Sequence, residues 1–277
     1  MTTQTPLEPT PPSPRPARRG SVLAVSIVTI VVGACALVGT VGGTAITAAA
    51  TLADTRSDIT AGSVSVRGLS DLAVDVAGGS LAIEYGDVAD ATLDAGGARR
   101  GGWTFERTGD SLRVSSPRGA FIDWDRSPAA TLTLPRSLQN TPIDARIDVT
   151  GGTLDLDADL RGLTVNLAGG AVEMSGSAET LAVTVAGGSA SAEVTGVDTA
   201  SFEVAGGELT AGLSGATPSR TSVTVTAGSA DITLPDDEYR VLNQDGIGSV
   251  DNSLRTSSSA KAVVDVEAAL GQVSLSS

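Results

Sequence analysis

The sequence predicts an all-β protein preceded by one transmembrane helix, with the strands stacked as a β-solenoid or β-helix-like array. Three observations predict this fold class: a strand-turn-strand unit that recurs at a period of roughly 18–21 residues, an apolar alternation of period two inside each unit, and an uncharged apolar run near the N-terminus. A β-sandwich is the alternative, but it would show hairpin turns such as Asn-Gly and uneven spacing, and neither dominates here.

The repeat is marked by strands that end in small-residue turns. The first glycines of successive turns are Gly151, Gly169, Gly187 and Gly206, with Ala227 in the next position, so the spacing is nearly even. One such unit cannot bury its apolar face alone, and stacking produces a continuous core. Many inward positions are alanines, so we expect a narrow interior. The units lie at 72–79, 147–152, 163–170, 181–188, 202–207 and 223–228, with weaker ones at 241–250 and 263–273.

The charges divide the chain into three segments. Residues 1–20 carry a net charge of +2, residues 21–53 carry none, and residues 54–277 carry −16. Twenty apolar residues at 22–41 span about 30 Å as a helix, the thickness of a bilayer core. The arginines precede this run, so the positive-inside rule places the N-terminus in the cytoplasm and the large acidic part outside.

We therefore expect a Pro/Arg-rich disordered tail at 1–20, a transmembrane helix at 21–43, a linker at 44–60 and an extracytoplasmic β-strand-repeat domain at 61–277. Two alternatives stay open for the N-terminal segment. A signal peptide could be cleaved after Ala48-Ala49-Ala50, although such apolar regions are usually about 7–15 residues long. A lipoprotein could be lipidated at Cys35, although the chain stays apolar beyond it. All three hypotheses place the large domain outside.

The stretch 93–135 interrupts the repeat and holds most of the large rings: Trp103, Phe105, Phe121 and Trp124. We expect these rings to cap an open end or edge of the array, since exposed sheet edges invite aggregation. A ligand-binding face built from exposed rings is the alternative, and an ordinary hairpin inserted between rungs is a third.

The order of features resembles the bacterial putative-adhesin family of β-strand-repeat domains, which is largely of unknown function. The resemblance rests on WTFERTGDSLRVS at Trp103–Ser115, on ATLTLPRSL at Ala130–Leu138, and on the glycine-ended strands that follow from Ile147 to Leu234. It covers roughly 61–277, nearly all of the part expected outside the membrane. The resemblance implies a β-solenoid-like extracytoplasmic fold, and no catalytic residues carry over from it.

The composition excludes several chemistries. The chain has no His and one Cys, which removes Cys/His zinc sites and hydrolases that need a His base. Its negative charge and few aromatic residues argue against nucleic acid as a partner. Carboxylates are the only plausible catalytic groups, and Asp155, Asp157 and Asp159 alternate along one strand. We expect them to form a solvated acidic face, with weak Ca²⁺ binding as the alternative.

The sequence thus predicts a non-enzymatic protein without a cofactor, an adhesin or a structural or binding module at the cell surface. Its expected partners are the membrane, through one helix, and an unidentified envelope polymer or protein. An envelope-sensing accessory of a membrane signalling system is the first alternative. A polysaccharide-active β-helix enzyme is the second.

Overall fold

The computed structural model describes residues 62–95, 102–117, 129–244 and 246–277. Within them the chain forms β-strands, and helical structure is limited to a 3₁₀ turn, η2 (Arg136–Leu138), which confirms the all-β class. In this part of the chain no helix is long and apolar enough to cross a membrane. The expected tail, transmembrane helix and linker lie outside the described residues and stay predictions.

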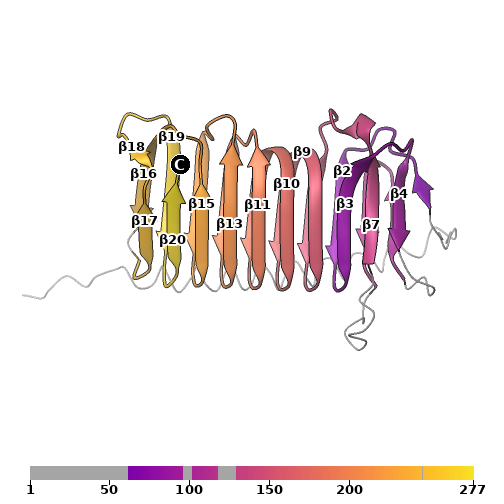
Figure 1. Ribbon diagram of the computed structural model, residues 1–277, viewed down its shortest axis with the longest axis horizontal. Coiled ribbons are helices and arrows are strands. Elements are labelled where there is room, and N and C mark those ends of the chain that lie inside the picture. Colours follow the sequence, from indigo (N-terminus) through magenta and orange to yellow (C-terminus); the bar gives the residue numbers. More distant parts are fainter. Residues whose placement is uncertain (1–61, 96–101, 118–128, 245) are drawn as a thin grey trace, which may run out of the picture.

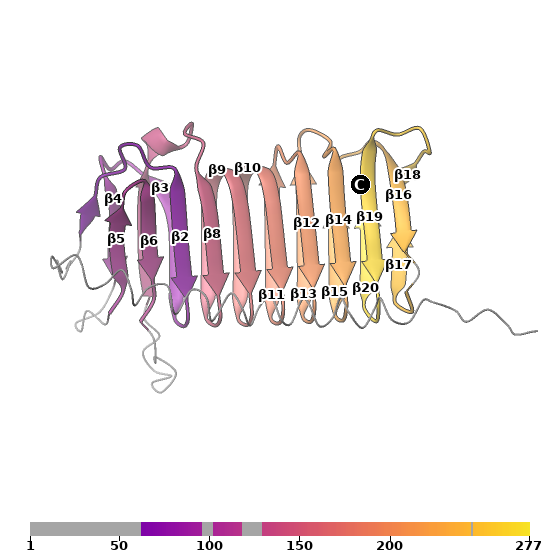
Figure 2. The ribbon, with the colours of Figure 1, turned by 180° about the vertical axis from the view of Figure 1, so that it is seen from behind.

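The described strands form one 20-stranded mixed sheet that is folded into two layers. The two layers belong to one sheet because β9 (Thr153–Leu167) and β10 (Ala171–Val185) each run through one layer and then bend into the other. Figure 1 faces the front layer and Figure 2 faces the back layer. In spatial order the front layer holds β1 (Ser63–Val64), β4 (Ala91–Ala95), β7 (Ala129–Pro135), β3 (Ser80–Gly86), the first halves of β9 and β10, β11 (Ser189–Thr195), β13 (Glu208–Ser214), β15 (Ser229–Thr233), β20 (Gln272–Ser276) and β17 (Ser249–Asn252). The back layer holds β5 (Thr104–Thr108), β6 (Ser111–Ser115), β2 (Asp71–Val76), β8 (Asp144–Val149), the second halves of β9 and β10, β12 (Thr199–Val204), β14 (Arg220–Val225), β19 (Ala262–Ala268), β16 (Glu238–Gln244) and β18 (Arg255–Thr256).

Equivalent residues of successive repeats lie beside each other along the array. Val172 pairs with Leu154 on one side and with Ala190 on the other, and each partner is one repeat away in the sequence. The pairing is parallel, so each side chain meets its counterpart from the next repeat. The register therefore reproduces the repeat spacing, and it differs from the antiparallel pairing that a β-sandwich would use.

The core lies between the two layers and follows the alternation of the sequence. In β11 the side chains of Ala190 and Ala192 face inward and are buried, whereas Ser189 and Glu193 face outward and are exposed. Alanines recur at inward positions of the neighbouring strands, for example Ala211 on β13. Small inward side chains allow the two layers to approach each other, and the narrow interior stays a prediction.

The second glycine of each turn holds neighbouring turns together. Gly170 has a φ of 98°, and the Cβ of any other residue there would collide with the carbonyl oxygen of Gly152 in the adjacent turn. The amide of Ala171 donates to the same oxygen at 3.0 Å. At the first position of its turn, Gly78 has an ordinary φ, and a Cβ added there would meet no atom of the described residues within 4 Å. Close backbone contact thus fixes glycine most strictly at the second position, whereas at the first position a Cβ added to Gly187 or Gly206 would lie 3.1 Å from a carbonyl oxygen of the preceding turn.

The order of rungs departs from the order of the sequence at both ends. Val76 on β2 pairs with Val149 on β8, although five strands lie between β2 and β8 in the chain. Of these intervening strands, β6 pairs with the edge of β2 that faces away from β8, and β7 pairs with the edge of β3 that faces away from β9. At the opposite end, β19 and β20 insert between the β14–β15 rung and the β16–β17 rung. An even stack in chain order is therefore seen only in the middle of the array.

The antiparallel pairs β1–β4, β4–β7 and β5–β6 gather at the N-terminal end of the array (Figure 2). Here the guanidinium of Arg107 on β5 donates to the carbonyl oxygens of Ser65 and Arg67, and its Nε donates to the carbonyl of Gly109. This end therefore carries strands that run antiparallel to the stack, and Arg107 ties β5 to the backbone at Ser65 and Arg67, while the outer edges of β1 and β5 have no partner strand among the described residues.

We expect Gly170→Ala to lower the free energy of unfolding by about 2 kcal/mol or more, because the added Cβ meets a fixed carbonyl and alanine is strained at positive φ. Gly78→Ala is the matched control and is expected to change stability by less than about 1 kcal/mol. Urea denaturation of both variants checks this, and equal destabilisation would contradict the role assigned to the second glycine.

A second prediction concerns Thr221, whose side chain faces inward on β14 between Ala200 and Val264. It is 1% exposed, and its hydroxyl has no hydrogen-bond partner among the described residues. Thr221→Val removes the unpaired hydroxyl at nearly constant volume, so we expect a gain of about 1 kcal/mol in thermal or urea unfolding. Val223→Thr on the same strand is the control, expected to lose about 1–3 kcal/mol. A loss of stability in Thr221→Val would refute this account.

Candidate binding face

The two layers differ in their charged side chains. No described strand of the front layer contains Lys or Arg, apart from Arg161 at the bend where β9 leaves that layer. The back layer carries the other strand arginines: Arg107, Arg113, Arg146, Arg220, Arg240 and Arg255. We call the outward side of the front layer the acidic face. Its carboxylates are Glu84, Asp94, Asp155, Asp157, Asp159, Glu173, Glu193, Glu208, Asp231 and Asp251.

The acidic face is ordered by the strand register. One row of outward residues crosses ten neighbouring strands, and polar or small side chains fill every position. Within this row Asp155 lies directly opposite Glu173, so two carboxylates occupy adjacent strands about 4.8 Å apart. The row runs Asp94, Thr131, Ala82, Asp155, Glu173, Ser191, Thr210, Asp231, Ser274 and Asp251.

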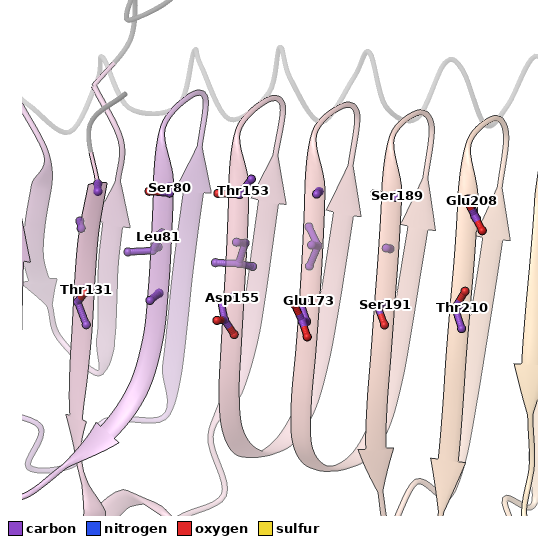
Figure 3. Close-up of a pocket in the computed structure, with 17 residues that line it drawn as sticks. Ser80, Leu81, Thr131, Thr153, Asp155, Glu173, Ser189, Ser191, Glu208 and Thr210 are labelled. Atoms are coloured by element: carbon purple, nitrogen blue, oxygen red, sulfur yellow. The ribbon is translucent and has the colours of Figure 1, made fainter. Parts of the chain in front are cut away.

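A shallow hollow of about 590 Å³ lies on this face over six strands, from β7 to β13 (Figure 3). Small outward residues such as Ala82, Ala129 and Ala171 leave it open, while Asp155, Glu173 and Glu208 supply negative charge. Six strands at about 4.8 Å make it roughly 24 Å long. An extended chain or a flat partner fits such a surface better than a small enclosed molecule does.

The structure places Asp155, Asp157 and Asp159 on one face of β9, as the alternation predicts. Successive ones are about 6.6–7 Å apart along the strand, whereas Ca²⁺ holds its oxygens at about 2.3–2.6 Å. Asp159 accepts a hydrogen bond of 2.7 Å from the hydroxyl of Ser177. Within the described residues no group of three or more potential ligands could hold a metal ion. Binding of Ca²⁺ by these aspartates stays a prediction.

The predicted aromatic residues separate into two sets. Phe105 is 6% exposed in the core, and Trp103 packs against the same core at the closed N-terminal end. The indole Nε1–H of Trp103 is buried and has no partner among the described residues. Phe105 therefore belongs to the core and Trp103 borders it, and the choice between a cap and a ligand-binding face stays a prediction. Phe121 and Trp124 lie outside the described residues.

One carboxyl of the back layer, that of Glu203, has a raised pKa. Burial raises the pKa of Glu203 on β12, a shift expected of a general acid. Its neighbours across the two adjacent strands are Thr184 and Thr224, so no second carboxylate lies directly beside it. A glycosidase needs a facing pair of carboxyl groups. The geometry around Glu203 gives no such pair on the adjoining strands.

Glu173, Glu208 and the small residues of the hollow are not among the sites that the sequence predicts. Each is ordinary in its own repeat, and only the register brings them together with Asp155. Sorting outward residues by alternate strands would have revealed the uneven distribution of arginine, because the repeat assigns successive strands to opposite layers.

No protein-family model matches this chain, and no curated protein matches it. Solved structures do. A protein from Clostridium sporogenes described as a putative cell adhesion protein is 14% identical, with 78% of this chain and 97% of that chain covered and a TM-score of 0.37. A protein from Bacteroides fragilis described as a putative adhesin is 12% identical, with 79% and 97% covered and a TM-score of 0.26. The chain is thus structurally similar to bacterial proteins of this description.

The facing pair Asp155–Glu173 gives a test of the register. Glu173→Gln removes the like-charge repulsion, so we expect the free energy of unfolding to rise by about 0.2–1 kcal/mol at low ionic strength. The gain should shrink in about 1 M salt, because the Debye length falls to about 3 Å. Glu193→Gln is the control, since Glu193 faces Ser175 and Gly212. An equal gain in both variants would mean that the cross-strand pair has no effect of its own.

Proposed function

We propose that the protein is a non-enzymatic β-solenoid held at the cell membrane by its N-terminal helix and displayed outside, where the acidic face binds an envelope polymer or protein. The solenoid assignment is supported by the parallel pairing of equivalent residues one repeat apart. The anchor and the outward orientation are supported by the apolar run at 22–41 and by the arginines that precede it.

The observation that carries the proposal is the absence of Lys and Arg from the described front strands before and after the bend at Arg161, combined with a hollow that extends across six of them. A surface that serves only solubility usually mixes charges of both signs. Solubility alone therefore does not explain why one layer lacks cationic side chains. Such a face attracts cationic groups, and it attracts anionic polymers when divalent cations bridge the two. The adhesin descriptions of the similar structures are compatible with this proposal and add no ligand.

The binding test compares two charge-neutralised variants of the full chain. Asp155→Asn with Glu173→Gln and Glu208→Gln alters the acidic face, whereas Glu203→Gln with Glu238→Gln and Glu267→Gln removes the same charge from the back layer. We expect the front variant to bind isolated cell envelopes at least tenfold more weakly, equivalent to about 1.4 kcal/mol, and the back variant to bind as the parent does. Equal behaviour of the two variants in a sedimentation assay would overturn the assignment of the face.

Adding a chelator identifies the kind of partner. Loss of binding indicates an anionic polymer bridged by divalent cations, and unchanged binding indicates a partner with cationic groups of its own. Two results would replace the proposal. Turnover of any member of a glycan panel would favour the enzyme, and a specific membrane partner captured through residues 1–50, without envelope binding by the acidic face, would favour a sensing accessory.

A further inference from the structure

The two ends of the array are built differently. At the N-terminal end the outer strands β1 and β5 run antiparallel to their neighbours, and Arg107 on β5 donates to the carbonyls of Ser65 and Arg67. At the other end the last rung consists of β16 and β17, and the only strand of the described residues beyond it is β18, which pairs with Glu238 and Tyr239 alone. The rest of β16 and the whole of β17 form free edges (Figures 1 and 2).

Backbone groups of β17 point away from the array. The amides of Ser249 and Ser253 donate to the carbonyls of Gly271 and Leu275 beside β20, at 3.0 and 2.9 Å. Amides alternate in direction along a strand, so those of Val250 and Asn252 face outward. No described strand pairs with them. An edge of this kind is a template for another strand.

The exposed large hydrophobic residues of the described chain gather at the same end. They are Leu242 on β16, Ile247 in the turn between β16 and β17, and Leu270 in the neighbouring turn, with exposed fractions of 45%, 86% and 68%. The amide of Ile247 donates to the carbonyl of Ala269 at 3.2 Å, which places Ile247 next to Leu270. Elsewhere in the described residues large apolar side chains are covered.

This rung is firmly joined to the array, so the edge is part of the folded surface. Tyr239 on β16 is fully buried, and its hydroxyl donates to the carbonyl of Pro235 at 2.7 Å. Burial raises the pKa of the Tyr239 phenol to about 12. Arg255 and Asp236 form an ion pair of 3.0 Å beside it. A frayed strand would not bury this tyrosine.

We propose that the free end binds a second copy of this chain, end to end, with β16 of each copy pairing antiparallel to β17 of the other. In the last rung β16 and β17 run in opposite directions in opposite layers. A twofold rotation about an axis along the strands keeps every strand direction and exchanges the layers. The rotation therefore places β16 of each copy beside β17 of the other. The unpaired backbone groups of both edges then form hydrogen bonds in the same contact.

A second copy fits this end better than a foreign peptide, because one extended peptide covers only one of the two edges. The same rotation leaves the turns at their own height, so Ile247 approaches Ile247 of the second copy, and Leu270, one rung farther from the axis, borders this contact. Head-to-tail stacking would instead place this rung against β1, which has only two residues, and against β5, which runs antiparallel to the stack, so β17 would find only a two-residue partner. The result is a closed pair rather than a filament.

Charge favours contact at this end. Residues 54–277 carry −16, but residues 235–261 around the last rung carry only −2, with Arg240, Arg255 and Lys261 against Asp236, Asp237, Glu238, Asp245 and Asp251. Lys261 is the only lysine of the chain. Two copies therefore repel each other less here than they would through the acidic face.

Cross-linking of the full chain in mild detergent tests the contact. The only native cysteine is Cys35, so a Cys35→Ser background carrying Ile247→Cys offers one thiol at the proposed axis. An added copper–phenanthroline oxidant accepts the two electrons as two thiols form a disulfide. We expect a linked dimer to form at least tenfold faster than with Asn140→Cys, an exposed turn position near the opposite end. Equal rates for the two variants would overturn the proposal.

A second experiment keeps the outcome independent of cysteine geometry. Val250→Pro removes an outward amide at an edge position where proline is tolerated, so the fold and its circular dichroism should be retained. Ile247→Asp removes apolar area at the contact. Sedimentation should show the parent chain as a dimer and each variant dissociating at about tenfold higher concentration or more. A parent that is monomeric throughout, or variants as dimeric as the parent, would refute the pairing.

Discussion

The contact between stacked glycine turns is the constraint on which the rest of the structure depends. Each second glycine lies against the backbone of the preceding turn, and the amide that follows it donates to the same carbonyl oxygen, as at Gly152, Gly170 and Ala171. Because backbone meets backbone there, neighbouring repeats cannot shift relative to each other without breaking a hydrogen bond or creating a collision. The register of every strand pair in the middle of the array follows from this contact.

A fixed register turns sequence position into surface pattern. Inward positions build a thin, continuous core from valine, leucine and alanine, and outward positions form straight rows across the strands. The front and back layers receive alternate strands, so a difference between alternate strands becomes a difference between two faces. The acidic face is the consequence: Asp155, Glu173 and Glu208 come from separate repeats and share one surface because the turns align them.

Much of the middle of the array could be predicted from the sequence, since the apolar alternation and the turn spacing act locally. The offset between Leu154 and Val172 is both one sequence period and one step between paired strands. The ends could not be predicted. The chain between Val76 and Val149 is long enough for several further rungs, yet the two residues are neighbours, because strands between them pair on the outer side. The face was missed for a related reason: its charges are separated by whole repeats, and only the three aspartates of β9 are visible as a local pattern.

The interleaved ends have a mechanical consequence. The last strands of the chain, β19 and β20, lie between two other rungs, so a pull on the C-terminus must extract an inner rung held along both of its sides. A stack in simple chain order would peel from its outermost rung, one strand at a time and at low force. In this protein the outermost rung is an internal segment of the chain, and tension applied to the terminus loads two ladders of hydrogen bonds together. Tension along β20 is thereby shared between its pairings with β15 and with β17.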